Sequence, residues 1–397
     1  MKKLLAILLV VTLALSIGII GCNGGQQEEE EEEEPIKIGA IYELTGTHSW
    51  YGTGVVEGIE LRLDEANYEV AGKPIEFIVE DNASDPDIAV DKVKKLVELD
   101  KIDLAMGPVF GHSHWAIAGY LTDHNIMGIF SHGTDWDLVT EYPEFFIAFE
   151  GPTRQNFAIL GDLAYDEGYR TMATIGMDYS AGYNMVQGVV DRFEAKGGTI
   201  VSQQWAPFAT ADYTSYLITV EESEADVLMF NIWMPDILTF LPQYYDLGVT
   251  TPWLTRVDEL TYPVNLDPLA ETIVGGRGMT RYPPSLDLPE AHEFNESFFA
   301  KYGRRPYEGQ LSGYIIMSIY LAGLERTGGD PSREAMWQAL QGLQLQTPKG
   351  LVTISCNGMC VVDQYMVELK LIEGEYVWDV FATYPQSSLD PRDTLCE

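Results

Sequence analysis

The chain has 397 residues, of which 46% are hydrophobic, and its 61 acidic residues against 24 basic ones give a formal net charge of −37 at pH 7. So strong a negative charge opposes binding to nucleic acid and to anionic lipid head groups. The length and the hydrophobic content are sufficient for a globular protein of two domains.

The first 22 residues are typical of a secretory signal peptide. Lys2 and Lys3 precede an apolar run that ends at "IIGC", and this run is too short for a stable membrane span. Its ending resembles the bacterial lipobox, whose cysteine becomes the lipid-modified first residue. We therefore expect residues 1–22 to be a lipoprotein signal peptide and Cys22 to carry the lipid, with an ordinary signal peptide as the alternative. The protein is then expected to be extracytoplasmic and lipid-anchored to the membrane, in the periplasm or at the cell surface.

An acidic stretch, residues 23–35, follows the cysteine and contains seven consecutive glutamates. Like charges at successive positions repel one another and keep the backbone solvated. This stretch is predicted to be a disordered tether.

After the tether, short β-branched runs alternate with amphipathic helical patterns. The first set of strands is predicted over 36–42, 74–81, 102–108, 126–131 and 144–150. Helices are predicted between them, one of which has Asp85 as its N-cap and Pro86 at its first position. Alternation at this spacing predicts parallel βαβ units with helices on both sheet faces.

The alternation then starts again and predicts a second, similar unit. Its helices are predicted over 153–167, 182–196, 213–222 and 234–247, and its strands over 171–178, 199–206, 226–231 and 251–256. Long helices follow over 290–302, 307–326 and 332–341, and a hairpin-like β segment ends the fold. The predicted fold class is α/β, with two similar doubly wound lobes.

The sequence contains no recognisable catalytic motif. It lacks G-x-S-x-G, H-E-x-x-H and P-loop patterns, and the glycines of 52–58 lie about ten residues too far after a strand for a dinucleotide fingerprint. Cys356, Cys360 and Cys396 allow one bridge, either across the Asn357-Gly358 turn or from Cys396 to one of the other two. No enzyme activity, cofactor or metal is expected.

Three segments together resemble the type I periplasmic binding proteins, and above all the leucine/isoleucine/valine-binding branch that serves ABC importers. The segments are "IKIGAIYELTGTHSWYGTGVVEGIELRLDEAN", "EFIVEDNASDPDIAVDKVKKLVE" and "GPVFGHSHWAIA". They hold, in order, Thr45-Gly46, Tyr51-Gly52, Gly58, Asp81, Asp85-Pro86 and Ala89. The resemblance covers roughly residues 36 to 385.

The resemblance implies two lobes that are joined by a three-segment hinge and close on a ligand. The three chain crossings are expected near 150–153, 276–281 and 346–352. The implied bounds are 36–151 and 279–349 for lobe 1, 152–278 and 350–385 for lobe 2, and 386–397 for a C-terminal tail.

The resemblance also implies a ligand site at the carboxyl ends of the strands. In lobe 1 it points to Trp50, Tyr51, Phe110, Gly111, His112, Ser113, His132, Gly133 and Thr134. In lobe 2 Ala181 stands where the family has a tyrosine, with Tyr179 close by, and Trp233 stands at the position of a second tyrosine. The acid that pairs with a ligand's ammonium falls near Asp258, and Arg256 lies two residues earlier.

His48, His112, His114 and His132 fall on loops that the resemblance directs at one cleft. Three interpretations stay open: hydrogen-bond donors to a ligand carboxylate, packing or surface residues, or a metal site without an evident carboxylate or cysteine to complete it. Tryptophans near the same loops, Trp50, Trp115, Trp136 and Trp233, favour a flat ligand through stacking unless they fill the core.

The expected function is capture of a small organic ligand (an amino acid, an amide or an aromatic or organic acid) and its delivery to an ABC transporter permease. We expect a monomer that contacts the membrane only through its lipid and binds no nucleic acid. A ligand sensor of the same fold is the first alternative, and a metal-binding receptor or an extracellular enzyme is less favoured.

Overall fold

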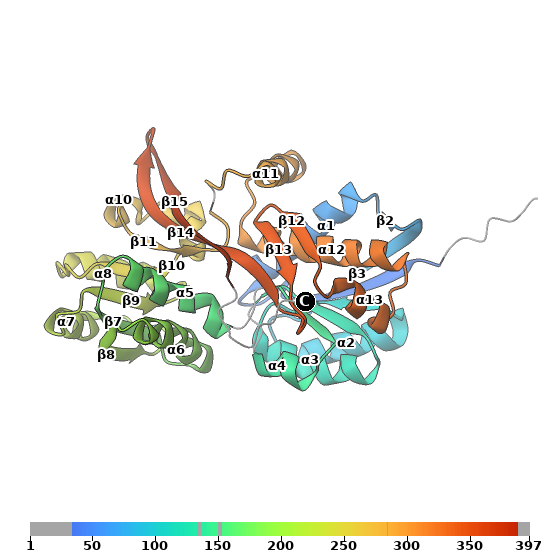
Figure 1. Ribbon diagram of the computed structural model, residues 1–397, viewed down its shortest axis with the longest axis horizontal. Helices are drawn as coiled ribbons and strands as arrows, with labels where there is room; N and C mark the ends of the chain where they lie inside the picture. The colour runs from blue at the N-terminus through green and yellow to red at the C-terminus, as the bar shows by residue number, and fades with distance from the viewer. Residues whose placement is uncertain (1–33, 133–135, 150–152, 284, 388–397) are drawn as a thin grey trace, which may run out of the picture. The chain divides into compact units, whose positions relative to one another are not determined.

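The computed structural model describes residues 34–132, 136–149, 153–283 and 285–387 (Figure 1). Its first sheet has six strands in the order β2-β3-β1-β4-β5-β6. These are β1 (Ile36–Tyr42), β2 (Glu69–Val70), β3 (Lys73–Asp81), β4 (Leu104–Met106), β5 (Met127–Phe130) and β6 (Phe146–Ala148). All except β2 pair in parallel, as the alternating pattern predicts.

Helices cover both faces of this sheet, because successive side chains of β1 enter different cores. Ile38 and Ala40 pack with α1 (Ser49–Glu65), α11 (Pro289–Tyr302), α12 (Glu308–Thr327) and α13 (Arg333–Leu340). Ile41 packs with α2 (Pro86–Lys95), α3 (Gly111–Asp123) and α4 (Trp136–Glu141). A π-helical turn (Leu96–Asp100) extends α2. We call this sheet and its helices the first lobe.

The start of α2 forms as the sequence predicts. The Asp85 side chain accepts hydrogen bonds from the backbone N–H groups of Asp87 and Ile88, and Pro86 occupies the first turn. The cap satisfies donors that have no partner within the helix.

The second sheet repeats the strand order of the first, as β8-β7-β9-β10-β11. Its parallel strands are β7 (Thr171–Met177), β8 (Thr199–Ala206), β9 (Val227–Asn231), β10 (Trp253–Arg256) and β11 (Arg277–Thr280). One face packs on α5 (Thr153–Asp166) and α6 (Ser180–Ala195). The other packs on α7 (Thr214–Glu222), α8 (Ile237–Asp246), α9 (Pro263–Leu266) and α10 (Ala270–Ile273). The prediction of two similar doubly wound lobes is confirmed, although β11 was not predicted.

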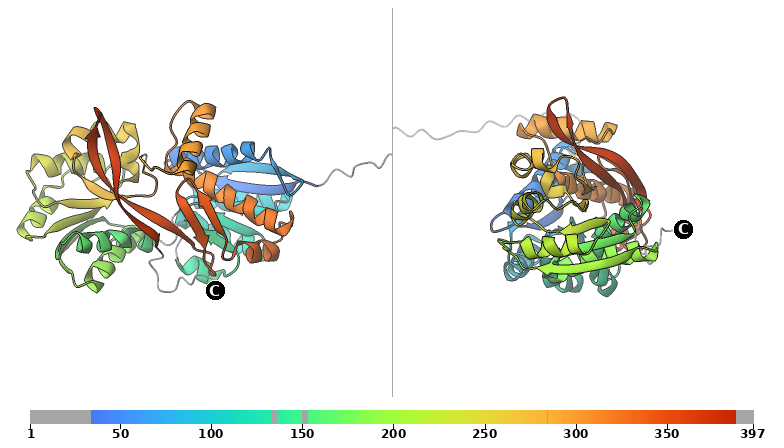
Figure 2. Two further views of the ribbon diagram at one scale, coloured as in Figure 1. Left: turned by 45° about the horizontal axis from the view of Figure 1, so that its top comes forward. Right: turned by 90° about the vertical axis from the view of Figure 1, so that its left-hand side faces the viewer.

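A long strand near the C-terminus belongs to both lobes (Figure 1, Figure 2). β14 (Cys360–Ile372) pairs first with β13 (Gly350–Ile354) and then with β11, while β15 (Glu375–Ser387) lies beside it. β12 (Gln344–Thr347) pairs with β13. Tyr365 packs in a core of the first lobe and Val367 in a core of the second. The expected lobe boundary at residue 350 lies before β13, whose apolar side chains pack in the first lobe. Sequence alternation runs unbroken through this segment and does not mark where the chain changes lobes.

Within the described residues, no helix combines the length and the apolar character that a membrane span needs. The expected signal peptide with Cys22, most of the tether and the last ten residues lie outside the described residues. Cys356 is disulfide-bonded.

Candidate functional site

The expected ligand-binding residues lie at the carboxyl ends of strands in both sheets, where parallel α/β folds place their ligands. In the first lobe, Tyr51 follows β1, Phe110 follows β4 and His132 follows β5. In the second lobe, Tyr179 follows β7, Trp233 follows β9, and Arg256 ends β10. Gly133 and Thr134 lie outside the described residues, so their expected role stays a prediction.

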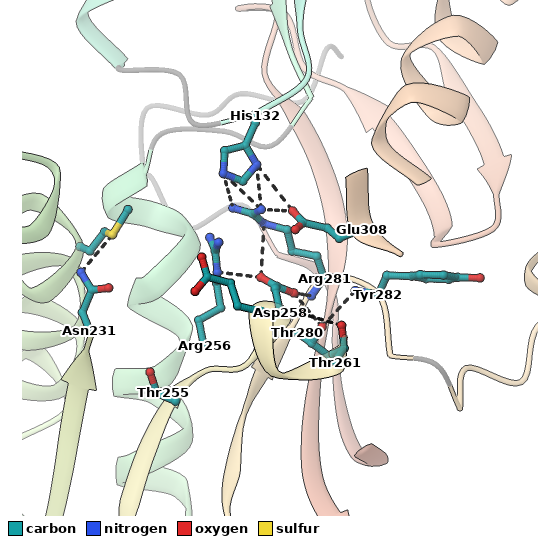
Figure 3. A network of polar contacts seen from close by, with 12 residues as sticks. His132, Asn231, Thr255, Arg256, Asp258, Thr261, Thr280, Arg281, Tyr282 and Glu308 are labelled. Atoms are coloured by element: carbon teal, nitrogen blue, oxygen red, sulfur yellow. Dashed lines mark hydrogen bonds and ion pairs between the residues drawn. The ribbon is translucent and has the colours of Figure 1, made fainter. Parts of the chain in front are cut away.

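A buried polar network joins the two lobes at this level (Figure 3). Arg281, directly after β11, forms an ion pair with Glu308 at the start of α12, and its Nη1 lies 2.8 Å from His132 Nδ1. The Tyr51 hydroxyl donates to Glu308 Oε1 at 2.9 Å. Arg281 is 3% and Glu308 5% exposed, so their charges compensate each other out of reach of bulk water. Neither residue was predicted from the sequence.

Asp258 is the second-lobe end of this network. It accepts hydrogen bonds from the Thr280 hydroxyl (2.7 Å) and from the backbone N–H of Arg281 (2.8 Å). Its Oδ2 lies 2.7 Å from Arg256 Nε and 4.0 Å from Arg281 Nε. Two arginines and two hydrogen-bond donors therefore already compensate the carboxylate that the family resemblance assigns to a ligand's ammonium.

The N-terminus of α3 follows the carboxyl end of β4 in the first lobe. The helix begins at Gly111, and its N-cap residue, Phe110, makes no side-chain cap. The first N–H groups of a helix have no acceptor within it and carry partial positive charge. Ser113 in the same turn is 0% exposed, and its hydroxyl has no hydrogen-bond partner among the described residues. His112 beside it is exposed. This turn is suited to an anion such as a carboxylate.

The histidines have different environments. The His114 ring is fully buried, stacks on Phe130 at 4.0 Å and lies 2.9 Å from the Pro108 carbonyl oxygen. Burial lowers the pKa of His114 to about 3, so it is a neutral packing residue. Burial together with the charge of Arg281 holds the pKa of His132 well below its usual range. The His48 ring lies tilted against Phe110, with the ring centroids 4.1 Å apart, and burial lowers the pKa of His48 too.

In the described part of the chain, no three His, Cys, Asp or Glu side chains come close enough together to hold a metal ion. The lowered pKa values of His48, His114 and His132 favour the neutral forms of these three rings.

In the second lobe, two aromatic rings lie next to the Arg256 guanidinium. The Arg256 guanidinium carbon lies 4.6 Å from the Trp233 ring and 5.2 Å from the Phe157 ring. Tyr179 is the N-cap residue of α6, and burial raises the pKa of its hydroxyl to about 12. Ala181, in the first turn of α6, is half-buried and packs against the neighbouring core.

Glu259, the neighbour of Asp258, was not among the predicted site residues. It lies in the 3-10 helix Asp258–Thr261, and its Oε2 accepts a hydrogen bond from the Met234 N–H at 2.7 Å. Burial raises the pKa of Glu259 to about 7. Within the described residues no cation forms an ion pair with Glu259, in contrast to Asp258. The sequence shows two adjacent acids after a strand. It does not show which of the two is paired with a cation.

Aromatic rings join the two lobes at the edge of this region. Tyr262 stacks on Tyr307 at 4.1 Å and meets Trp50 edge-on at 5.6 Å. Trp50 is 48% exposed and also contacts Tyr51 edge-on. The predicted Trp50 thus lies at the solvent-exposed side, with Tyr262 and Tyr307 as partners that the sequence did not suggest.

Comparison with known proteins agrees with this architecture. A family model described as "Periplasmic binding protein" matches residues 35–374. Leu/Ile/Val-binding protein homolog 6 of Brucella suis biovar 1 is 24% identical over 352 residues, which cover 86% of this chain and 90% of that protein.

Solved structures show the same fold. An ABC transporter substrate-binding protein from Sphaerobacter thermophilus has a TM-score of 0.84 and 27% identity, covering 89% of this chain and 98% of that one. A solute binding protein of an ABC transporter from Rhodopseudomonas palustris BisB5, solved with 3,4-dihydroxybenzoic acid, has a TM-score of 0.79 and 23% identity, covering 90% and 99%.

Proposed function

Because the chain belongs to the periplasmic binding protein family, we propose that it is the lipid-anchored receptor of an ABC importer and that its ligand is an amino acid. We infer the class of ligand from two groups, one in each lobe, that lack a partner of opposite charge. One is the N-terminus of α3 with the Ser113 hydroxyl, and the other is the Glu259 carboxyl.

The α3 turn supports binding of the ligand's carboxylate. Helix N–H groups and a buried hydroxyl are donors that a carboxylate oxygen accepts from well, and the helix dipole adds a favourable field. The unpartnered Ser113 hydroxyl costs free energy while it remains without an acceptor, so a bound carboxylate would remove that cost.

Glu259 supports binding of the ligand's ammonium. An amino acid brings a cation to a carboxyl group whose ionisation is disfavoured by burial and which accepts only a backbone N–H. Asp258 is a poor candidate for the same role, because Arg256 and Arg281 already compensate its charge. We therefore propose Glu259, rather than Asp258, as the acid that binds the ligand's ammonium.

The first experiment is a calorimetric titration of the purified protein with matched ligand pairs that differ only in the ammonium group. The pairs are L-leucine and 4-methylpentanoate, L-phenylalanine and 3-phenylpropanoate, and L-glutamate and glutarate. We expect an amino acid to bind and its deaminated partner to bind at least tenfold more weakly, because a charged hydrogen bond contributes about 1.5–3 kcal/mol.

Variants assign the effect to the residue. Glu259→Gln should weaken amino-acid binding by about thirtyfold, which corresponds to about 2 kcal/mol, while leaving a deaminated acid unaffected. Glu222→Gln, an exposed acid at the end of α7, is the matched control and should change nothing. Tighter binding of the deaminated acids would replace the amino-acid proposal by an organic-acid one, to which the Trp233 surface is also suited.

The anchoring part of the proposal rests on the "IIGC" sequence. Cys22→Ser should move the protein from the membrane fraction to the soluble fraction of its host, and mass spectrometry should find no lipid on the variant. A wild-type protein without lipid would contradict it.

A further inference from the structure

Arg256 is a buried cation with an incomplete set of partners. It is 8% exposed, and its Nε lies 2.7 Å from Asp258 Oδ2. No hydrogen bond runs from its guanidinium to any residue that the structure describes, and Asp258 is its one ion-pair partner there. Its guanidinium carbon lies over the rings of Trp233 and Phe157. The N–H groups on the edge of the guanidinium that does not face Asp258 therefore remain for hydrogen bonding.

That edge belongs to the candidate ligand region. Figure 3 shows Arg256 rising from β10 beside Asp258, on the side of the network where His132 of the first lobe lies. Burial lowers the pKa of His132 and raises that of Tyr179. In both cases the charge of Arg256 acts to lower the pKa, so it acts on groups of both lobes. Glu259 is close enough to experience the same charge.

Physical chemistry restricts what a ligand can present to such a group. An aliphatic side chain would remove the guanidinium from water and give it no acceptor, which is unfavourable. A planar carboxylate or carboxamide can accept from the guanidinium edge in the geometry that arginine favours. The Trp233 ring, 4.6 Å from the guanidinium carbon, restricts the directions from which that acceptor can approach.

We propose that Arg256 sets the specificity of the site by receiving a planar oxygen acceptor at the end of the bound amino acid's side chain. The ligand then belongs to the glutamine and glutamate class and not to the branched aliphatic class. This inference rests on the proposed function, which supplies the positions of the α-carboxylate and the ammonium.

The test compares side chains of similar length in the wild-type protein. Calorimetric titrations use L-glutamine, L-glutamate, L-methionine and L-leucine. L-glutamine or L-glutamate should bind at least tenfold more tightly than either of the other two, since one charge-assisted hydrogen bond is worth at least that factor. Which of the two acceptor ligands binds more tightly says whether the acceptor is an amide or a carboxylate.

Two substitutions link the preference to Arg256. Arg256→Met should lower affinity for the acceptor ligand by about thirtyfold or more and raise affinity for L-methionine, so that the ranking reverses. Arg256→Lys keeps the charge without the planar fork, so it should give an intermediate loss. Arg326→Met, at the exposed C-terminal end of α12, is the control and should leave the ranking unchanged.

The wild-type ranking stands on its own if a variant does not fold. Tighter binding of L-leucine or L-methionine than of both acceptor ligands would overturn this inference and leave the amino-acid proposal intact. Binding of deaminated acids alone would overturn both.

Discussion

Adjacent residues, Asp258 and Glu259, have opposite electrostatic environments. Although burial acts to raise it, the pKa of Asp258 is lowered, because Arg256 and Arg281 lie beside the carboxylate. Glu259 lacks such an ion pair, and burial raises its pKa from 4.5 to about 7. Protonated Glu259 is thus favoured in the folded state, so its contribution to stability is complete below pH 4.5 and is lost as the pH rises through about 7. We expect the free energy of unfolding of the ligand-free protein to fall as the pH rises through about 7. Glu259→Gln should remove this pH dependence. Urea titrations of both proteins from pH 4.5 to pH 8 measure the difference, and parallel pH profiles would contradict the assignment.

At the scale of elements, glycines let α1 and α12 pack closely enough to form the first-lobe side of the network. A Cβ atom on Gly58 would lie 1.9 Å from the Gln310 carbonyl oxygen, so any larger residue forces the helices apart. The same contact brings Tyr51 of α1 to Glu308 of α12. We expect Gly58→Ala to lower the free energy of unfolding by about 1–3 kcal/mol, as overpacking usually does. Gly119→Ala in α3 is the control, because its Cβ would meet only the Tyr142 hydroxyl, at 3.4 Å, and alanine favours a helix. Equal urea midpoints for the two variants would show that the helices can separate without cost.

At the scale of the whole molecule, Arg281 connects the lobes. It lies where the chain leaves the second sheet, and its partners Glu308 and His132 belong to the first lobe while Asp258 belongs to the second. Arg281→Met leaves buried Glu308 without its counter-charge, which should cost about 3–5 kcal/mol of unfolding free energy. Arg281→Met combined with Glu308→Gln should cost less than the sum of the two single variants, because the isolated charge is gone. Urea unfolding of all four proteins gives the coupling free energy, and additive costs would contradict direct coupling of the pair.

The amino-acid sequence by itself determined most of the segments that become helices and strands, although not β11. The strands at 36–42 and 199–206 and the cap at Asp85 occur as predicted, because burial pattern and capping act over a few neighbouring residues. It also pointed to the carboxyl ends of the strands, near which Tyr51 and Arg256 lie. The sequence did not show which charged groups compensate each other. Tyr51 and Glu308 are 257 residues apart, and only the path of the chain through both lobes brings them into contact. Tertiary structure likewise put His114 in the core and placed an arginine beside Asp258 but no ion-pair partner beside Glu259 among the described residues, because charge compensation depends on neighbours in space and not on neighbours in sequence.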